Sequence, residues 1–192
     1  MGLIQNPTGI AAEQAVQFLT PSIAHTEADE IFPWFGVRTR SNYEKITATV
    51  LDNKGFEQYL PTYRSRRRWS DRVVETKQAL FPGYVFCRFD PKNRLPILTT
   101  PGVVAIVGCG NEPAPISDEE IAAVQMILIS ELASSPCPFL SEGQRIRVIR
   151  GALTGVEGIL MKKKSSWRLV VSVSMLQRSI SVEIDRDWVT TC

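Results

Sequence analysis

The stretch Leu80-Phe81-Pro82-Gly83-Tyr84-Val85-Phe86 is the part of the sequence that decides the fold. Aromatic residues occupy it where an ordinary core strand would carry aliphatic ones. Because proline cannot donate to a sheet ladder, Pro82-Gly83 predicts a bulge at the start of a strand. Alternation along that strand places Tyr84 and Phe86 on one face. Two interpretations stay open: both aromatics belong to the core, or their face meets a partner.

The composition indicates a globular protein of ordinary size with a divided charge. Its 192 residues are 44% hydrophobic, which is enough for one ordinary domain and a small second one. The net charge is only +2, but residues 61–77 hold six basic against two acidic side chains. Residues 141–192 hold nine basic against five acidic ones, whereas residues 1–32 hold four acids and no Lys or Arg. The two basic regions predict two surfaces that face polyanions.

Several classes of function are disfavoured by what the sequence lacks. No apolar run is long enough to span a bilayer and the N-terminus does not resemble a signal peptide, so we expect a cytoplasmic protein without membrane partners. The four cysteines are widely spaced and form no CxxC pair, so we expect no metal and no cofactor. The single histidine, His25, lies in a segment that we expect to be a tail. An enzyme would need a nucleophile, base or metal cluster, and we find none in the sequence.

The first part of the chain predicts an acidic tail followed by an α/β domain over residues 31–132. Residues 1–30 form the expected flexible tail, with one short helical piece around residues 11–19. Trp34 to Arg38 predicts a strand. Ser41 and Glu44 form the capping box of a helix that should end near Gly55. The expected buried stripe of that helix is Tyr43, Ile46 and Val50.

Further segments complete the expected domain. Phe56 to Leu60 and Leu80 to Phe89 predict strands, and Pro61 to Lys77 is a polar, arginine-rich excursion between them. We therefore expect a strand, loop, strand arrangement with a basic loop at its tip. The apolar run Val103 to Val107 predicts a short buried strand. Ser117 to Glu120 repeats the capping box. The helix that follows should bury Ile121, Val124 and Leu128.

A change of pattern near residue 133 predicts a second domain. Residues 133–140 contain small residues and two prolines, so we expect a linker. Residues 141–192 contain several short β-branched segments between glycines. Because closure removes exposed edges, a small β-barrel is the natural fold for them. The predicted strands are Arg145 to Val148, Ile159 to Met161, Leu169 to Val173 and Ile180 to Ile184.

A set of motifs in a fixed order carries a family resemblance. They are Trp34-Phe35-Gly36-Val37-Arg38-Thr39 with Tyr43-Glu44-Lys45, Leu80 to Phe86, Thr100-Pro101-Gly102-Val103-Val104 with Val107-Gly108, Pro115-Ile116-Ser117, and then Gly143, Arg145, Arg147, Val148, Gly151, Gly155, Glu157 and Gly158. In this order they resemble NusG-type transcription elongation factors, in which an N-terminal NusG domain precedes a KOW domain. The last eight residues correspond to the KOW motif, and the resemblance covers about residues 33–190.

The resemblance implies an α+β fold. An N-terminal α/β sandwich-type domain, with a mainly antiparallel sheet and flanking helices, is joined by residues 133–140 to a small SH3-like KOW barrel over residues 141–192. It also implies a bacterial elongation and antitermination factor, not an enzyme, that binds the clamp helices of the largest subunit of RNA polymerase and suppresses pausing or termination. This favours a partner face for at least some of the aromatics. The polymerase-binding residues carried over by position are Trp34, Phe81, Pro82, Tyr84 and Phe86.

The arginine-rich segment departs from a housekeeping NusG protein and resembles the specialised RfaH-like and UpxY-like antiterminators. Arginine forks bind phosphates bidentately, and Trp69 would stack on an unpaired base. We expect this segment to bind the non-template DNA strand or the nascent RNA, although a plain charged hairpin is the alternative. The residues expected to bind nucleic acid are Arg64, Arg66, Arg67, Arg68, Trp69 and Arg72.

The resemblance further implies that the KOW domain of a monomeric protein recruits a second partner, either the termination factor Rho or a small-subunit ribosomal protein. Some relatives refold this domain into a helical hairpin, but the β-branched residues from Leu169 to Ile184 predict strands here. A competing hypothesis is an RNA-binding module of ribosomal type, in which the KOW barrel is primary and polymerase contact is incidental.

Overall fold

The computed structural model describes residues 32–69, 72–140, 143–163 and 166–192, and the side chains of these residues except for 66–69, 72–74 and 163. The predicted tail over residues 1–30, with its helical piece, therefore lies outside the described residues. Among the described residues, no helix has both the length and the apolar character needed to cross a membrane.

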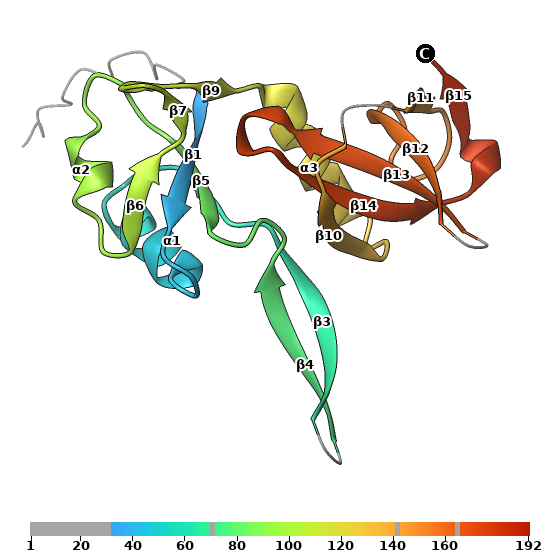
Figure 1. The fold of residues 1–192 in the computed structure, drawn as a ribbon, viewed down its shortest axis with the longest axis horizontal. Helices are drawn as coiled ribbons and strands as arrows, with labels where there is room; N and C mark the ends of the chain where they lie inside the picture. The colour runs from blue at the N-terminus through green and yellow to red at the C-terminus, as the bar shows by residue number, and fades with distance from the viewer. Residues whose placement is uncertain (1–31, 70–71, 141–142, 164–165) are drawn as a thin grey trace, which may run out of the picture. The chain divides into compact units, whose positions relative to one another are not determined.

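An antiparallel sheet organises the first part of the described chain (Figure 1). Strand β1 lies at its centre, between β5 on one side and β6 and β9 on the other. The short strand β2 pairs with the outer side of β5. The predicted strand at Trp34 to Arg38 is confirmed as β1. The strands are β1 (Trp34–Thr39), β2 (Gln58–Tyr59), β5 (Tyr84–Arg88), β6 (Val103–Ile106) and β9 (Pro115–Ile116).

Strand β5 begins later than the sequence predicted. Residues 80–83 form a turn ahead of the strand instead of a bulge within it, and Gly83 has φ of 84°. This left-handed conformation suits glycine because it has no Cβ. The run Val103 to Val107 also differs, since β6 is a partly exposed strand and Val104 is 48% exposed. A continuous apolar run looks the same in the sequence whether one face or both faces are covered.

Helix α1 (Glu44–Asn53) is present where predicted, but it begins and packs differently. Its N-cap residue makes no side-chain hydrogen bond. The Glu44 carboxylate accepts from the backbone N–H of Gly83 at 2.8 Å, a long-range bond that replaces the predicted capping box. The predicted buried stripe is wrong: Tyr43 is 40% exposed and Ile46 is 52% exposed. The helix instead buries Thr47, Ala48 and Leu51.

Helix α3 (Asp118–Ile129) agrees more closely with the sequence. The Ser117 hydroxyl accepts from the backbone N–H of Glu120 at 3.2 Å, as one half of the capping box predicts. The carboxylate of Glu120 does not close the box, because it accepts from the N–H of Ser174 at 3.1 Å. The buried residues are Ile121, Val124 and Ile127, so Ile127 takes the place predicted for Leu128. A short helix α2 (Leu95–Leu98) precedes β6 and was not predicted.

The expected basic loop is a β-ribbon, which corrects the prediction. Strands β3 (Thr62–Trp69) and β4 (Arg72–Ala79) pair in antiparallel register from Thr62 opposite Ala79 to Trp69 opposite Arg72. Figure 1 shows them as a ribbon of their own, and within the described chain they pair only with each other. A strand that joins no buried sheet has no apolar alternation, so its polar composition is indistinguishable from that of a loop.

A six-stranded antiparallel sheet forms the last part of the chain, in the order β10-β14-β13-β12-β11-β15. The four predicted strands of this region are confirmed. Its interior is filled by β-branched residues and leucines, among them Ile146, Leu169, Val171, Ile180 and Val182. The strands are β10 (Ser134–Pro138), β11 (Gln144–Val148), β12 (Glu157–Lys163), β13 (Ser166–Val173), β14 (Arg178–Ile184) and β15 (Val189–Thr191).

Three features of this region were not predicted. Strand β10 lies within residues 133–140, where a linker was expected, and it pairs with β14 along the whole of its length. The 3-10 turns η1 (Ser174–Leu176) and η2 (Arg186–Trp188) follow β13 and β14.

The first part of the chain also contains a small hairpin between β6 and β9. It consists of β7 (Gly108–Cys109) and β8 (Glu112–Pro113).

Candidate binding surfaces

The two faces of the β1–β5 sheet carry different residues. One face holds Val37, Val85 and Cys87, which pack with α1 in an apolar cluster. On the opposite face of β5 lie Tyr84 and Phe86, so the predicted alternation is confirmed. We call this second surface the aromatic face; it consists of Trp34, Tyr59, Phe81, Tyr84, Phe86 and Arg88.

The rings of the aromatic face form a continuous cluster. Phe86 packs edge-on against Phe81, with centroids 5.3 Å apart and an interplanar angle of 85°. It stacks with Tyr59 at 6.1 Å, and Tyr59 meets Trp34 edge-on at 6.4 Å. Such contacts add about 0.5–1.5 kcal/mol per pair to the burial of the rings. The cluster therefore holds its members in fixed orientations.

Arg88 closes one end of the aromatic face. Its guanidinium carbon lies 4.7 Å from the centre of the Trp34 ring, within cation–π distance. One terminal nitrogen donates to Asp118 Oδ1 at 2.6 Å, and the other donates to Glu57 Oε2 at 3.4 Å. Because both carboxylates are largely exposed, each pair contributes little stability by itself. Their clearer effect is to fix the guanidinium over the tryptophan.

Two polar atoms of the aromatic face are buried without a partner among the described residues, Tyr59 Oη and Arg88 Nε. Burial raises the pKa of the Tyr59 hydroxyl from 10.0 to about 12. A buried donor without an acceptor costs about 1–3 kcal/mol.

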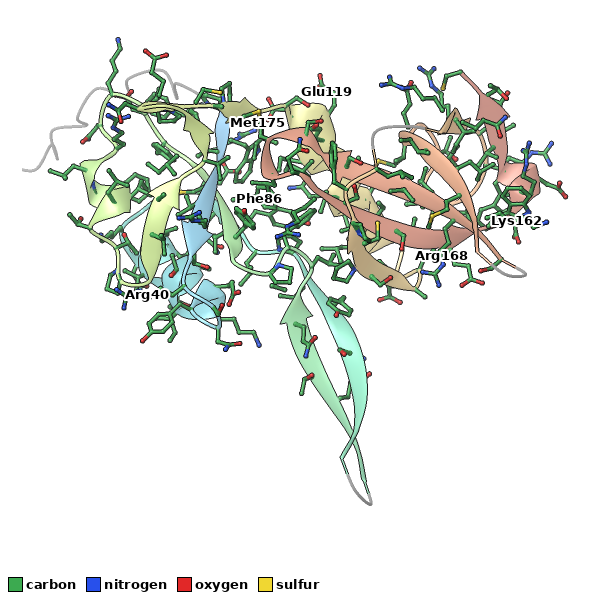
Figure 2. All side chains as sticks on the ribbon, in the orientation of Figure 1. Arg40, Phe86, Glu119, Lys162, Arg168 and Met175 are labelled. Atoms are coloured by element: carbon green, nitrogen blue, oxygen red, sulfur yellow. The ribbon has the colours of Figure 1, made fainter. Side chains whose placement is uncertain are left out.

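The residues predicted to bind polymerase differ in their accessibility. Trp34, Phe81 and Phe86 are no more than 4% exposed, Tyr84 is half-buried, and Pro82 is exposed. The three buried rings belong to a cluster that also contains residues of α3 and Leu176 of η1. The structure therefore brings four of the five together as one cluster and leaves Pro82 outside it on the turn before β5. Figure 2 labels Phe86 within this cluster.

Sequence reasoning missed two members of the aromatic face, Tyr59 and Arg88. Arg88 follows Phe86 at the same alternation of two that placed Tyr84, so the pattern itself could have included it. Tyr59 is opposite Phe86 in the β2–β5 register, which no local pattern contains. Only the pairing of strands distant in the sequence brings it onto this face.

The six residues predicted to bind nucleic acid all belong to the β3–β4 ribbon. Arg64 is exposed, and its strand position is opposite Lys77. The side chains of Arg66, Arg67, Arg68, Trp69 and Arg72 are not described, but their strand positions are. The register sets Arg67 opposite Val74, Arg68 opposite Val73 and Trp69 opposite Arg72. The predicted residues therefore gather toward one end of a two-stranded ribbon.

The predicted KOW residues form the β11–β12 hairpin and its approach. Glycines occur at positive φ, with 137° at Gly143, 81° at Gly151 and 92° at Gly155, where L residues would be strained. Gly158 has a different reason to be glycine, because a Cβ there would lie 2.4 Å from the Val170 carbonyl oxygen of the next strand. Val148 is buried in the core.

Charged KOW residues lie on the outside of the same hairpin. Arg147 Nε donates to Glu157 Oε1 at 2.8 Å, and this contact raises the pKa of the already basic guanidinium. Arg145 is exposed on the same strand. Elsewhere on this sheet, Lys162 Nζ and the Arg186 guanidinium lie 5.4 Å and 5.6 Å from the Trp167 ring centre. Lys162 and Arg186 therefore gather beside Trp167, whereas the charge of Arg147 is offset by Glu157.

An antiparallel sheet with one aromatic face, a two-stranded ribbon and a strand-rich C-terminal sheet define an α+β protein. A profile of the family described as "Transcription termination factor nusG" matches residues 32–125. The transcription termination/antitermination protein NusG of Thermus thermophilus is 29% identical over 175 residues, covering 79% of this chain and 94% of that protein. The Escherichia coli K12 protein of the same name is 28% identical over 170 residues, covering 79% and 92%.

A solved structure titled "Domain interaction in Thermotoga maritima NusG" has the same fold, with a TM-score of 0.50 and 21% identity over 82% of this chain and 95% of that one. These similarities support a NusG-type transcription termination/antitermination factor. Its C-terminal strands correspond to the KOW domain of the expected fold.

Proposed function

We propose that this protein binds RNA polymerase through the aromatic face and suppresses pausing or termination during elongation in the cytoplasm. The observation that carries the proposal is the aromatic face itself. Its rings form one cluster and supply large area with few rotatable bonds. The clamp helices of the largest subunit are the partner that the family resemblance implies, and helices present both apolar and polar side chains to such a surface.

The accessible and the buried residues of the aromatic face would contribute differently to polymerase binding. Pro82 and Tyr84 are accessible, so they would contact polymerase first. Trp34 and Phe86 are covered, in part by Leu176, whose Cδ2 would lie 2.6 Å from a Cβ placed on Gly36. Direct contact with these buried rings would require that cover to move. Without such movement, Trp34, Phe81 and Phe86 would support the accessible residues from beneath.

A binding assay with purified full-length protein and core RNA polymerase tests this proposal. Tyr84→Ala should weaken binding at least about tenfold, as expected for an aromatic residue at an interface centre. Tyr43→Ala is the matched control, because Tyr43 is also a partly exposed tyrosine but lies at the start of α1, away from the aromatic face. Circular dichroism would confirm that both variants are folded. Wild-type affinity in Tyr84→Ala would contradict the proposal.

We further propose that the β3–β4 ribbon binds single-stranded nucleic acid beside the polymerase. The arginines of this two-stranded ribbon gather toward one end, where their guanidinium groups would meet a phosphate backbone. Replacing Arg66, Arg67 and Arg68 by Gln should reduce the slope of log affinity against log salt by about 2–3, since each lost phosphate contact removes about 0.7–0.9.

The same three positions replaced by Lys form the matched control, because lysine keeps the charge and loses the fork. The probes are a single-stranded DNA and an RNA of the same sequence, which distinguish the two candidate ligands. An unchanged salt slope in the Gln variant would contradict nucleic-acid binding by the ribbon.

The KOW region would then recruit a second protein, either Rho or a small-subunit ribosomal protein. Its own six-stranded sheet, and the cations Lys162 and Arg186 beside Trp167, support this role. If polymerase binding fails while RNA binding by the C-terminal region persists, the RNA-binding module of ribosomal type becomes the better description.

A further inference from the structure

Strand β10 is an unusual edge for the C-terminal sheet. It consists of Ser134-Ser135-Pro136-Cys137-Pro138 and lies beside β14, whose interior-facing residues are Ile180, Val182 and Ile184. None of the five β10 residues is fully buried, and the two prolines are exposed. Elements with few buried apolar contacts open at low free-energy cost. The edge strand is therefore held mainly by backbone and hydroxyl hydrogen bonds.

The register determines which β10 atoms point toward β14. Glu183 N–H donates to the carbonyl of Ala133 at 3.4 Å, and Ser135 is paired with Ser181 in the same register. In an antiparallel ladder, alternate pairs exchange hydrogen bonds, so the odd-numbered β10 residues bond to β14. The nitrogens of Pro136 and Pro138 consequently point away from it. The outer edge of β10 lacks two of its N–H donors, which prevents a further strand from being added there.

The side chains along this seam leave a cation incompletely satisfied. Arg168 on β13 donates through Nη1 to the hydroxyls of Ser135 at 3.5 Å and Ser181 at 3.3 Å, both long contacts. Its Nη2 lies 3.8 Å from Glu183. Its Nε is buried with no acceptor among the described residues. Figure 2 labels Arg168 in this sheet. The Ser135 hydroxyl offers the guanidinium a single acceptor, at 3.5 Å. A carboxylate at this position would offer two acceptor oxygens and bind the guanidinium bidentately.

We propose that the β14 edge is a strand-exchange site: a partner protein displaces β10 with an extended segment that carries an Asp or Glu at the position of Ser135. The ladder would supply affinity through backbone hydrogen bonds, as in other cases of strand addition. Arg168 would supply selectivity for the acidic residue. The inference concerns this edge alone, and its test does not depend on whether the aromatic face binds polymerase.

Hydrogen exchange in the wild-type, full-length chain provides the first test. Amides of Ser179, Ser181 and Glu183 point toward β10, whereas those of Ile180 and Val182 on the same strand point toward β13. If β10 detaches, the first group should exchange at least about 100-fold faster than the second. Equal protection of the two groups would show that β10 is a permanent strand and would overturn the proposal.

A peptide probe provides the second test. The resident strand competes at an effective concentration of about millimolar, so it has to be weakened first. Ser135→Pro removes an N–H that points into the ladder, and Ser134→Pro, the matched control, removes one that points outward. A fluorescent peptide with the sequence of residues 133–140 carrying Ser135→Asp should bind the Ser135→Pro chain at least about tenfold more tightly than the Ser134→Pro chain.

Arg168 accounts for the choice of an acidic residue in this assay. In the Ser135→Pro chain, the Asp-containing peptide should bind more tightly than the same peptide with serine, and Arg168→Gln should abolish that preference. Equal binding to both proline variants, or a preference that survives Arg168→Gln, would overturn the proposal. If Ser135→Pro does not fold, the exchange measurement on the wild-type chain decides by itself.

Discussion

Phe86→Ala should destabilise the protein by about 4 kcal/mol, because Phe86 is a core residue of the aromatic face. The Phe86 ring is 0% exposed and packs against both Phe81 and Tyr59. Truncating a buried phenylalanine costs about 3–5 kcal/mol through lost transfer energy and the remaining cavity. The loss of two aromatic contacts keeps the expectation away from the lower end of that range. The change would remove a large share of the 5–15 kcal/mol typical of a folded domain.

Urea unfolding, followed by the fluorescence of Trp34 and the other tryptophans, measures this loss. With a slope of about 2 kcal/mol per molar urea, the midpoint should fall by about 2 M. Phe86→Leu is the control, because it retains most of the volume and should cost less than about 1.5 kcal/mol. A loss below about 1 kcal/mol in Phe86→Ala would refute the core assignment. Loss of polymerase binding in that stable variant would instead identify Phe86 as a direct contact.

Three further outcomes follow from the geometry. Tyr59→Phe should raise the free energy of unfolding by up to about 1 kcal/mol, because it removes a buried hydroxyl without a partner among the described residues; a destabilised variant would contradict this. Burial raises the pKa of Cys87 from 9.0 to about 12, with a smaller contribution from Glu57, and burial also raises that of Tyr59 to about 12. Both groups therefore lose their protons at lower pH in the unfolded chain than in the folded one. Their contribution to the free energy of unfolding should be complete below pH 9 and should decline toward pH 12. A flat profile in alkaline denaturation would contradict this prediction. Ser117→Ala should cost about 1 kcal/mol in thermal unfolding, since it removes the cap of α3; an unchanged midpoint would show that the cap is dispensable.

The sequence predicted the elements whose pattern is local. Period-two alternation identified the two faces of β5 and strand β11, and β-branched or apolar runs identified the other C-terminal strands. The segment Trp34 to Arg38 was likewise recognised as a strand, β1. Ser117 was recognised as a cap because its bond to Glu120 spans only three residues. In these cases the residues that determine the element lie within it.

The predictions that were wrong depended on distant partners. Glu44 resembles a capping residue, but its carboxylate bonds to Gly83, 39 positions away, and α1 starts and packs accordingly. The strands of the β3–β4 ribbon are largely polar and pair with no other described strand, so little in their composition distinguishes them from a loop. Strand β10 has the small residues and prolines of a linker, and only its register with β14 reveals it as a strand.

The residues of the candidate site also divide into those that a local pattern predicts and those that only distant strand pairing places. The alternation that identified Tyr84 and Phe86 could have been extended to Arg88, but Tyr59 is brought onto the aromatic face only by pairing with β5. The sequence also could not tell which aromatics are accessible. That depends on α3 and η1, which lie far along the chain from β5.

The isolation of the β3–β4 ribbon has a consequence for how this protein can change over evolutionary time. Its eight-residue strands extend over about 26 Å at the usual rise per residue, and within the described chain they share hydrogen-bonded pairs only with each other. Substitutions toward its tip therefore remove little from either core. Descendants of one ancestral gene could acquire new arginines, or lose old ones, and so address different nucleic-acid signals while the scaffold remained intact.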